Sequence, residues 1–117
     1  MSQQALIKRS AAAAAANTDT VLFTPAAGTR YRLLAFHVVN ETAAQVAGMS
    51  FELRIGANIV TIVGFDVAAA PIGQTSKQAI IAEEFVGNGS DAINGRNLTA
   101  LNTASIAAYC LVYETVE

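Results

Sequence analysis

The side chains in this sequence that are chemically able to act in catalysis are few and far apart. His37 is the single histidine and Cys110 the single cysteine. A catalytic histidine or cysteine needs a positioned partner such as a carboxylate, whereas the sequence neighbours of both residues are apolar. We therefore interpret His37 as a packed or interface side chain. We interpret Cys110 as a small hydrophobic residue of the core.

The carboxylates and the polar loops also lack the spacing that catalysis or metal binding requires. Glu83 and Glu84 are adjacent, so on a strand their side chains point to opposite faces and do not share a proton. The segment 87–97 carries amide and hydroxyl oxygens but one carboxylate, Asp91, and a calcium loop needs more carboxylates at fixed spacing. The sequence has no phosphate-binding glycine loop, zinc motif or nucleophile elbow. It therefore predicts neither an enzyme nor a metal or cofactor site.

The composition indicates a protein that buries part of its surface against partners. The 117 residues suit one domain, and only 14% of them are charged, against a usual share of about 25%. A small domain exposes much of its surface and needs charge to stay soluble alone. The net charge is −2 and no basic run exceeds Lys8-Arg9, which argues against nucleic acid as a partner. Asn, Thr and Ser interrupt the apolar stretches, so we expect a soluble protein with no membrane partner.

Short β-type segments alternate with turns after residue 18. Runs rich in β-branched and aromatic residues are separated by Gly, Pro and Asn, which is the pattern of strands joined by tight turns. The expected strands are 19–24, 29–40, 49–55, 59–67, 78–86, 98–102 and 105–116, with a loop at 87–97. The clearest hairpin joins 49–55 to 59–67 through a short glycine turn. This spacing predicts an all-β fold, an antiparallel and jelly-roll-like β-sandwich of about 7 or 8 strands.

The first 18 residues differ from the rest of the chain. Ala5, Leu6 and Ile7 are followed by a basic pair and by an alanine run at 11–16, which Ser10 is able to cap. A run of this length is too short to hold a helix in water without packing. We divide the chain into an alanine-rich N-terminal arm, residues 1–18, and a β-sandwich domain, residues 19–117. The arm is either a frayed tail or a segment that docks on a neighbouring subunit, with Ala5, Leu6 and Ile7 as its apolar anchor.

Two of the expected strands, 30–40 and 105–116, are apolar on both faces, although a strand with one face in water normally alternates apolar and polar residues. We assign one set of side chains to the inner core: Leu34, Phe36, Val38, Ile106, Ala108, Cys110 and Val112. The opposite set carries Tyr31, Leu33, His37, Tyr109, Leu111 and Tyr113, and tyrosines suit interfaces because they combine an apolar body with a polar tip. An apolar outer face of this extent usually marks a contact surface. The alternative is that one chain covers both faces, for example with its N-terminal segment.

The order of these segments is similar to that of a known group of proteins. A Gly-x-Arg run leads into a hydrophobic strand at 28–39, a Gly-x-x-Leu strand follows at 95–101, and a hydrophobic strand ending in Tyr-x-Glu covers 107–114. This layout, over residues 18–117, resembles small tailed-bacteriophage virion proteins with jelly-roll or immunoglobulin-like sandwich folds. The alanine-rich N-terminal segment lies outside the resemblance.

The resemblance implies a non-enzymatic structural protein of a bacteriophage virion that needs no cofactor. Decoration or cement proteins of this group sit on the outer capsid surface, often as trimers, and stabilise the head by bridging capsomers. We accordingly expect a homo-oligomer, a trimer in the leading interpretation, that is made in the host cytoplasm and binds the major capsid protein. The alternative is a β-sandwich domain of a tail or fibre that binds a host-surface glycan, for which the lack of tryptophan is unfavourable.

Overall fold

The computed structural model describes residues 3–65, 67 and 69–116, and this part of the chain consists of strands and connecting loops without a helix. Its nine strands are β1 (Gln3–Ser10), β2 (Thr18–Phe23), β3 (Arg30–Asn40), β4 (Ser50–Ile55), β5 (Asn58–Gly64), β6 (Ala79–Ile80), β7 (Glu84–Val86), β8 (Ile93–Asn97) and β9 (Ala107–Val116).

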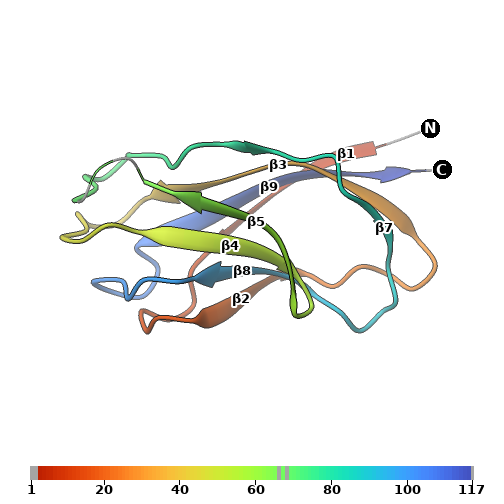
Figure 1. The fold of residues 1–117 in the computed structure, drawn as a ribbon, viewed down its shortest axis with the longest axis horizontal. Helices are drawn as coiled ribbons and strands as arrows, with labels where there is room; N and C mark the ends of the chain where they lie inside the picture. Colours follow the sequence, from red (N-terminus) through yellow and green to blue (C-terminus); the bar gives the residue numbers. More distant parts are fainter. Residues whose placement is uncertain (1–2, 66, 68, 117) are drawn as a thin grey trace.

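The strands form two antiparallel sheets that pack face to face (Figure 1). Sheet A has the order β1-β9-β3-β6, and β7 also pairs with β3; sheet B has the order β2-β8-β4-β5. The molecule is elongated, with extents of 43 × 23 × 19 Å. The predicted all-β, antiparallel, jelly-roll-like sandwich is confirmed.

Three segments differ from the strand assignment made on the sequence. Residues 93–97, expected in a loop, form β8, which lies between β2 and β4 in sheet B. Residues 98–102, expected as a strand, are a connection, and the segment 78–86 contains the two short strands β6 and β7. The sequence of β8, INGRN, is polar and contains Gly95, so local β-propensity does not identify it.

The N-terminal residues belong to the sandwich in this structure. Gln3–Ser10 forms β1, an edge strand of sheet A that pairs antiparallel with β9. The alanines at 11–16 form no helix. The Ala11 amide donates a hydrogen bond to the Ala107 carbonyl at 2.8 Å, and from there the chain continues towards sheet B. Because β1 extends sheet A sideways, it does not cover the outer face of β9 and β3. The idea that the N-terminal segment shelters that face is therefore not supported.

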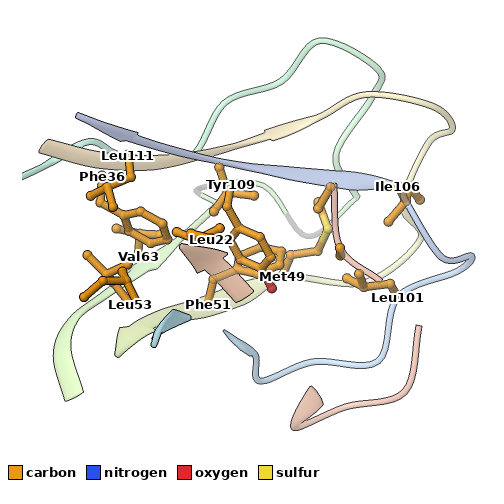
Figure 2. Close-up of a cluster of buried hydrophobic side chains, with 14 of the residues drawn as sticks. Leu22, Phe36, Met49, Phe51, Leu53, Val63, Leu101, Ile106, Tyr109 and Leu111 are labelled. Carbon is orange, nitrogen blue, oxygen red and sulfur yellow. The ribbon is translucent and has the colours of Figure 1, made fainter. Parts of the chain in front are cut away.

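The hydrophobic core lies between the sheets, and Tyr109 lies near its centre (Figure 2). Its ring meets Phe51 edge-on, with centroids 5.6 Å apart, and lies nearly parallel to Phe36 at 6.1 Å. The ring also lies directly over Gly95 of β8, where an added Cβ would be 2.6 Å from ring atoms. A glycine is required in β8 because any side chain would occupy the space of this ring.

A second group of aromatic rings packs in another part of the core. Phe23 stacks on Tyr113 with centroids 4.6 Å apart, and Tyr31 stacks on Phe85 at 5.6 Å. The hydroxyl of Tyr31 accepts a hydrogen bond from the Ala26 amide at 3.1 Å. The rings of both tyrosines thus pack inside the molecule.

The faces of β9 are opposite to the assignment made on the sequence. Tyr109 and Leu111, expected on the outside, have no exposed surface and belong to the core cluster. Cys110, expected in the core, pairs with His37 and lies on the other face of sheet A. The reversal follows from Gly95, which opens a space for Tyr109 that the sequence of β9 does not reveal.

The faces of β3 change along the strand because of a β-bulge. Leu33 pairs with Tyr113 but Ala35 pairs with Val112, so Leu34 is the extra residue. A bulge of one residue shifts the alternation of side chains between the two faces. Leu33 therefore joins Phe36 in the core, with no exposed surface for either. The expected inner position of Phe36 and Val38 is confirmed, while the assignment of Tyr31 and Leu33 to the outside, and of Leu34 to the core, is wrong.

Candidate interaction surfaces

An apolar row crosses the outer face of sheet A. Leu6 pairs with Val112, Val112 with Ala35, and Ala35 with Ile80, and directly paired residues present their side chains on the same face. Leu6 is 67% exposed and Ile80 is 81% exposed. We call these four residues the apolar row. It runs from the edge strand β1 to the short strand β6 at the opposite side of the sheet.

A cluster of charges borders the apolar row on one side. Arg32 donates to Glu114 at 2.6 Å and to Glu84 at 3.0 Å, and Arg30 lies 3.5 Å from Glu84. The hydrogen bonds with Glu84 and Glu114 raise the pKa of the Arg32 guanidinium. We call this group the Arg32 cluster. It gives the apolar row a polar margin of ion pairs.

A polar row borders the apolar row on its other side. Lys8 pairs with Cys110, and Cys110 with His37; Lys8 also forms an ion pair with Glu41. Burial raises the pKa of the Cys110 thiol. A cysteine attacks as its thiolate, so the protonated thiol is a poor nucleophile. The hydrogen bond with Glu41 raises the pKa of Lys8. These contacts favour a structural role for this row.

His37 is half-buried and lines a shallow hollow with Thr75, Ser76 and Gln78. The hydroxyl of Ser76 accepts a hydrogen bond from the Val38 amide at 2.9 Å and donates to the Lys77 carbonyl at 3.0 Å, so it is occupied by the backbone. Among the described residues, no three His, Cys, Asp or Glu side chains gather in a way that would hold a metal ion.

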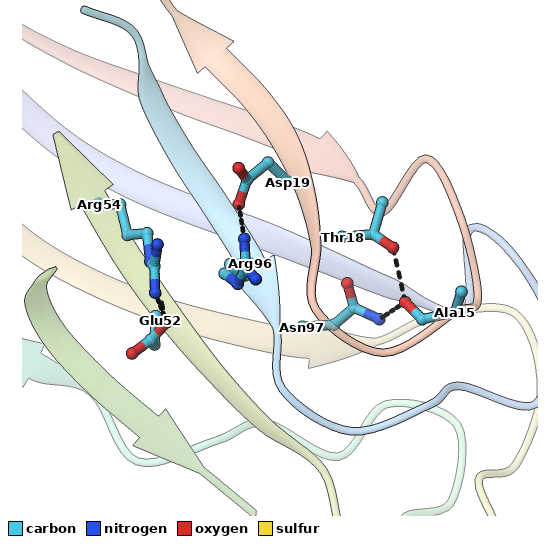
Figure 3. Close-up of polar contacts among 7 residues, drawn as sticks. All are labelled: Ala15, Thr18, Asp19, Glu52, Arg54, Arg96 and Asn97. Carbon is cyan, nitrogen blue, oxygen red and sulfur yellow. Dashed lines mark hydrogen bonds and ion pairs between the residues drawn. The ribbon is translucent and has the colours of Figure 1, made fainter. Parts of the chain in front are cut away.

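The outer face of sheet B carries paired charges instead of an apolar row (Figure 3). Asp19 of β2 and Arg96 of β8 form an ion pair at 3.1 Å, and Glu52 and Arg54 of β4 form one at 2.9 Å. Glu52 is only 4% exposed. At the margins of this face lie exposed aliphatic residues, Val21 on β2 and Ile59 and Ile62 on β5.

The structure places some of the residues predicted to form contacts in the core and others on the outer face of sheet A. Tyr31, Leu33, Tyr109 and Leu111 are buried in the sandwich itself, so the structure does not offer them to a partner. Ile7 and Tyr113 are half-buried and pack against the core, and Ala5 faces the same way as Tyr113. Of the predicted residues, Leu6 and His37 lie on the outer face of sheet A.

The surface residues that sequence reasoning missed are Ile80, Val112, Ile59 and Ile62. Ile80 belongs to the run AII at 79–81, which lies in the segment 78–86 that the sequence predicts to be one strand. In the structure β6 has only two residues and leaves Ile80 almost fully exposed. The sequence signal that Ile59 and Ile62 form a contact surface is the lack of charge in 58–64. This signal becomes informative only once β5 is known to be an edge strand.

Within the described residues, the structure contains no helix long and apolar enough to cross a membrane.

No protein-family model matches the chain, and no curated protein matches its sequence. Solved structures do share its fold. A chain of the cyanophage Pam1 capsid asymmetric unit is 9% identical and has a TM-score of 0.62, with 97% of this chain and 83% of that chain covered. The PRD1 vertex protein P5 is 13% identical with a TM-score of 0.51, covering 97% and 73% of the two chains. A chain of the Helicobacter pylori bacteriophage KHP30 capsid is 10% identical with a TM-score of 0.51, covering 99% and 94%.

At these identities the likeness concerns the fold. The chain has a jelly-roll-like β-sandwich fold that it shares with chains of these two phage capsids and with the PRD1 vertex protein P5.

Proposed function

We propose that this chain is a structural protein of a virion and that it acts by binding other protein subunits. The observation that carries the proposal is the apolar row, which exposes Leu6 and Ile80 on the outer face of sheet A. The fold shared with phage capsid and vertex chains supports a virion as the setting. The described residues supply no metal cluster. Cys110 and His37 are cross-strand neighbours, but burial raises the pKa of the Cys110 thiol and so disfavours the thiolate that a cysteine nucleophile requires.

Within a virion, we propose the role of a decoration or cement protein on the outer capsid surface. Protein interfaces commonly have an apolar centre and a polar rim. The apolar row has such a setting, because the Arg32 cluster lies on one side of it and the row of Lys8, Cys110 and His37 on the other. A partner that covers the apolar row is able to pair with these polar groups at the same time.

Decoration would stabilise the head by adhesion. A standard interface buries about 800 Å² per partner, which is about one seventh of the 5697 Å² surface of this chain. We propose that the major capsid protein covers the outer face of sheet A and that copies of this chain bridge neighbouring capsomers, with a homotrimer as the expected oligomer. In this scheme β1 replaces the predicted free arm, and Leu6 is its contact residue.

The alternative of a glycan-binding tail or fibre domain receives no support from the side chains. Sugar-binding surfaces usually present exposed aromatic rings. All five Phe and three Tyr of the chain lie in the described residues, and each of them is buried or half-buried.

Co-sedimentation with capsid shells of the virus that encodes this chain tests the proposal. The double variant Leu6→Lys, Ile80→Lys places two charges in the apolar row, at exposed positions where the fold tolerates them. We expect the variant to bind shells at least about tenfold more weakly than the wild type, because a desolvated charge opposes docking.

Val21→Lys is the matched control, since Val21 is a 55% exposed aliphatic residue on the outer face of sheet B. It is expected to bind as the wild type does. Equal binding by the double variant would reject the apolar row as the docking surface. Absence of the chain from purified virions, tested by mass spectrometry, would reject the virion role as a whole.

A further inference from the structure

The edge strand β5 lacks most of the features that usually keep sheet edges apart. Edge strands are commonly protected by Lys, Pro, a short length, a β-bulge or a covering segment, and of these β5 has a bulge at Val60. β5 has seven residues, Asn58–Gly64, with the sequence NIVTIVG and no charge or proline. It is the last strand of sheet B, next to β4. Ile59 is 53% exposed and Ile62 is 57% exposed.

The free edge of β5 can be located from the hydrogen bonds around it. The Gly64 carbonyl accepts a hydrogen bond from the Lys77 amide at 3.3 Å, so the backbone of Gly64 faces away from β4. Backbone groups alternate in direction along an antiparallel strand, which turns the backbone of Ile62 outwards as well. In the described part of the chain, no other backbone hydrogen bond from outside sheet B reaches residues 58–63.

A bulge gives Ile59 the same orientation as Ile62. Leu53 pairs with Thr61 and Arg54 pairs with Ile59, so Val60 is the extra residue. The bulge makes the three-residue step from Ile59 to Ile62 equivalent to two positions of a regular strand. Both isoleucines therefore turn their backbone amide and carbonyl to the free edge. Their side chains lie on the outer face of sheet B, because their partners Arg54 and Glu52 do.

From this arrangement we propose that β5 pairs antiparallel with β5 of a second copy of the chain, across a twofold axis close to Val60 and Thr61. Ile59 of each copy lies opposite Ile62 of the other, and the two residues exchange backbone hydrogen bonds. The two B sheets become one continuous eight-stranded sheet, since each contributes four strands. Four isoleucine side chains form a patch on its outer face, between the Glu52–Arg54 ion pairs of the two copies.

The charges favour a second copy of β5 over the other long edge of the molecule. β1, the edge of sheet A, carries Lys8 and Arg9. Two β1 strands paired antiparallel would bring these cations together, which is the usual protection of an edge. Two copies of β5 meet without any like charges, and their exposed isoleucines match.

The contact is expected to be reversible and weak. Pairing of two single strands buries less than the roughly 800 Å² per partner of a standard interface. Because the β5 edge and the apolar row are different surfaces, the contact does not depend on the proposed virion function and adds to any contact made through sheet A.

Sedimentation velocity across a range of protein concentrations tests the proposal. The wild type is expected to show a dimer fraction that rises with concentration. Ile62→Lys is expected to weaken dimerisation at least about tenfold, because it adds like charges across the twofold axis. Val21→Lys, a matched change on the edge strand β2 of the same sheet, is expected to leave the dimer unchanged. A wild type that stays monomeric, or an Ile62→Lys variant that dimerises normally, would overturn the proposal.

The register is tested by cross-linking two single-cysteine variants in a Cys110→Ala background. An oxidised mixture of Ile59→Cys and Ile62→Cys is expected to give a disulfide-linked heterodimer in higher yield than either variant alone. Circular dichroism checks that each variant is folded. Equal yields in the mixture and in the separate samples would reject this register.

Discussion

The two faces of sheet A use the same strands for different purposes. The inner face of β3 and β9 carries Leu33, Phe36 and Leu111, which have no exposed surface. The outer face of the same strands, together with β1 and β6, carries the apolar row, in which Leu6 and Ile80 are mostly exposed. Both faces are apolar, but only one is covered by sheet B. Hydrophobicity alone therefore does not tell which face of a strand is the core.

The inner face is also where the chain tolerates least change. Its side chains interlock around Tyr109, with Gly95 below the ring and Phe51 at its edge. The outer face has charged margins and exposed side chains whose packing constrains one another little. We expect mutations to separate the two faces by their effect on stability and on association.

The largest contrast is expected from one substitution made on each face. Leu111→Ala removes a fully buried side chain and should lower the free energy of unfolding by about 2–5 kcal/mol, because it leaves a cavity. Leu6→Ala is the same chemical change at a residue that is 67% exposed and should cost less than about 0.5 kcal/mol. Urea denaturation measures both, and equal losses would contradict the assignment of the faces.

The next effect concerns the space below Tyr109. Gly95→Ala places a Cβ 2.6 Å from the ring and should destabilise the protein by about 1–3 kcal/mol, since the ring or β8 must move. Gly48→Ala is the control, because no atom lies within 4 Å of the Cβ it would add. A Gly95→Ala variant as stable as Gly48→Ala would show that the ring does not lie over β8.

A smaller effect is expected at the hydroxyl of Tyr109. Burial raises the pKa of Tyr109, and its hydroxyl has no hydrogen-bond partner among the described residues. Tyr109→Phe should therefore leave the free energy of unfolding unchanged or raise it by up to about 1 kcal/mol, because an unpaired buried polar group is lost. Tyr31→Phe, which removes the acceptor of the Ala26 amide, should be less stable than the wild type. Thermal unfolding followed by circular dichroism ranks the two variants.

The smallest effect on stability is expected on the outer face. Arg32→Met breaks the ion pairs with Glu84 and Glu114, which lie at the surface, where salt screens them. The melting temperature should fall slightly at low ionic strength and match that of the wild type at about 1 M salt. A large loss that persists in high salt would mean that the Arg32 cluster is part of the core architecture.

Several elements of the fold were predictable because their signals are local. The strand β4 and the β4–β5 hairpin follow from alternating apolar residues and from the turn at Gly56, which has a φ of +58°. The strand β3 follows from a run rich in β-branched and aromatic residues. Two elements were missed for opposite reasons. β8 is polar and is a strand because β2 and β4 flank it, and β1 was taken for an arm because its partner β9 lies at the other end of the sequence.

The candidate interaction surfaces were predictable only in outline. The shortage of charge pointed to contacts with partners, and Leu6 and His37 do lie on the outer face of sheet A. The tyrosines do not, because a polar tip suits a residue to an interface but does not keep it out of a core. The exposure of Ile80 depends on the two-residue length of β6, which no local pattern encodes.

The sequence by itself determined that this protein is an antiparallel β-sandwich with apolar side chains on both faces of two long strands, because alternation and turn residues are read from neighbours along the chain. The tertiary structure decided which of those faces is the core. The bulge at Leu34 shifts the alternation along β3, and Gly95 admits the ring of Tyr109 from a strand on the other sheet. Both effects arise from contacts between residues that are distant in sequence, so the choice between inside and outside is made only when the two sheets pack.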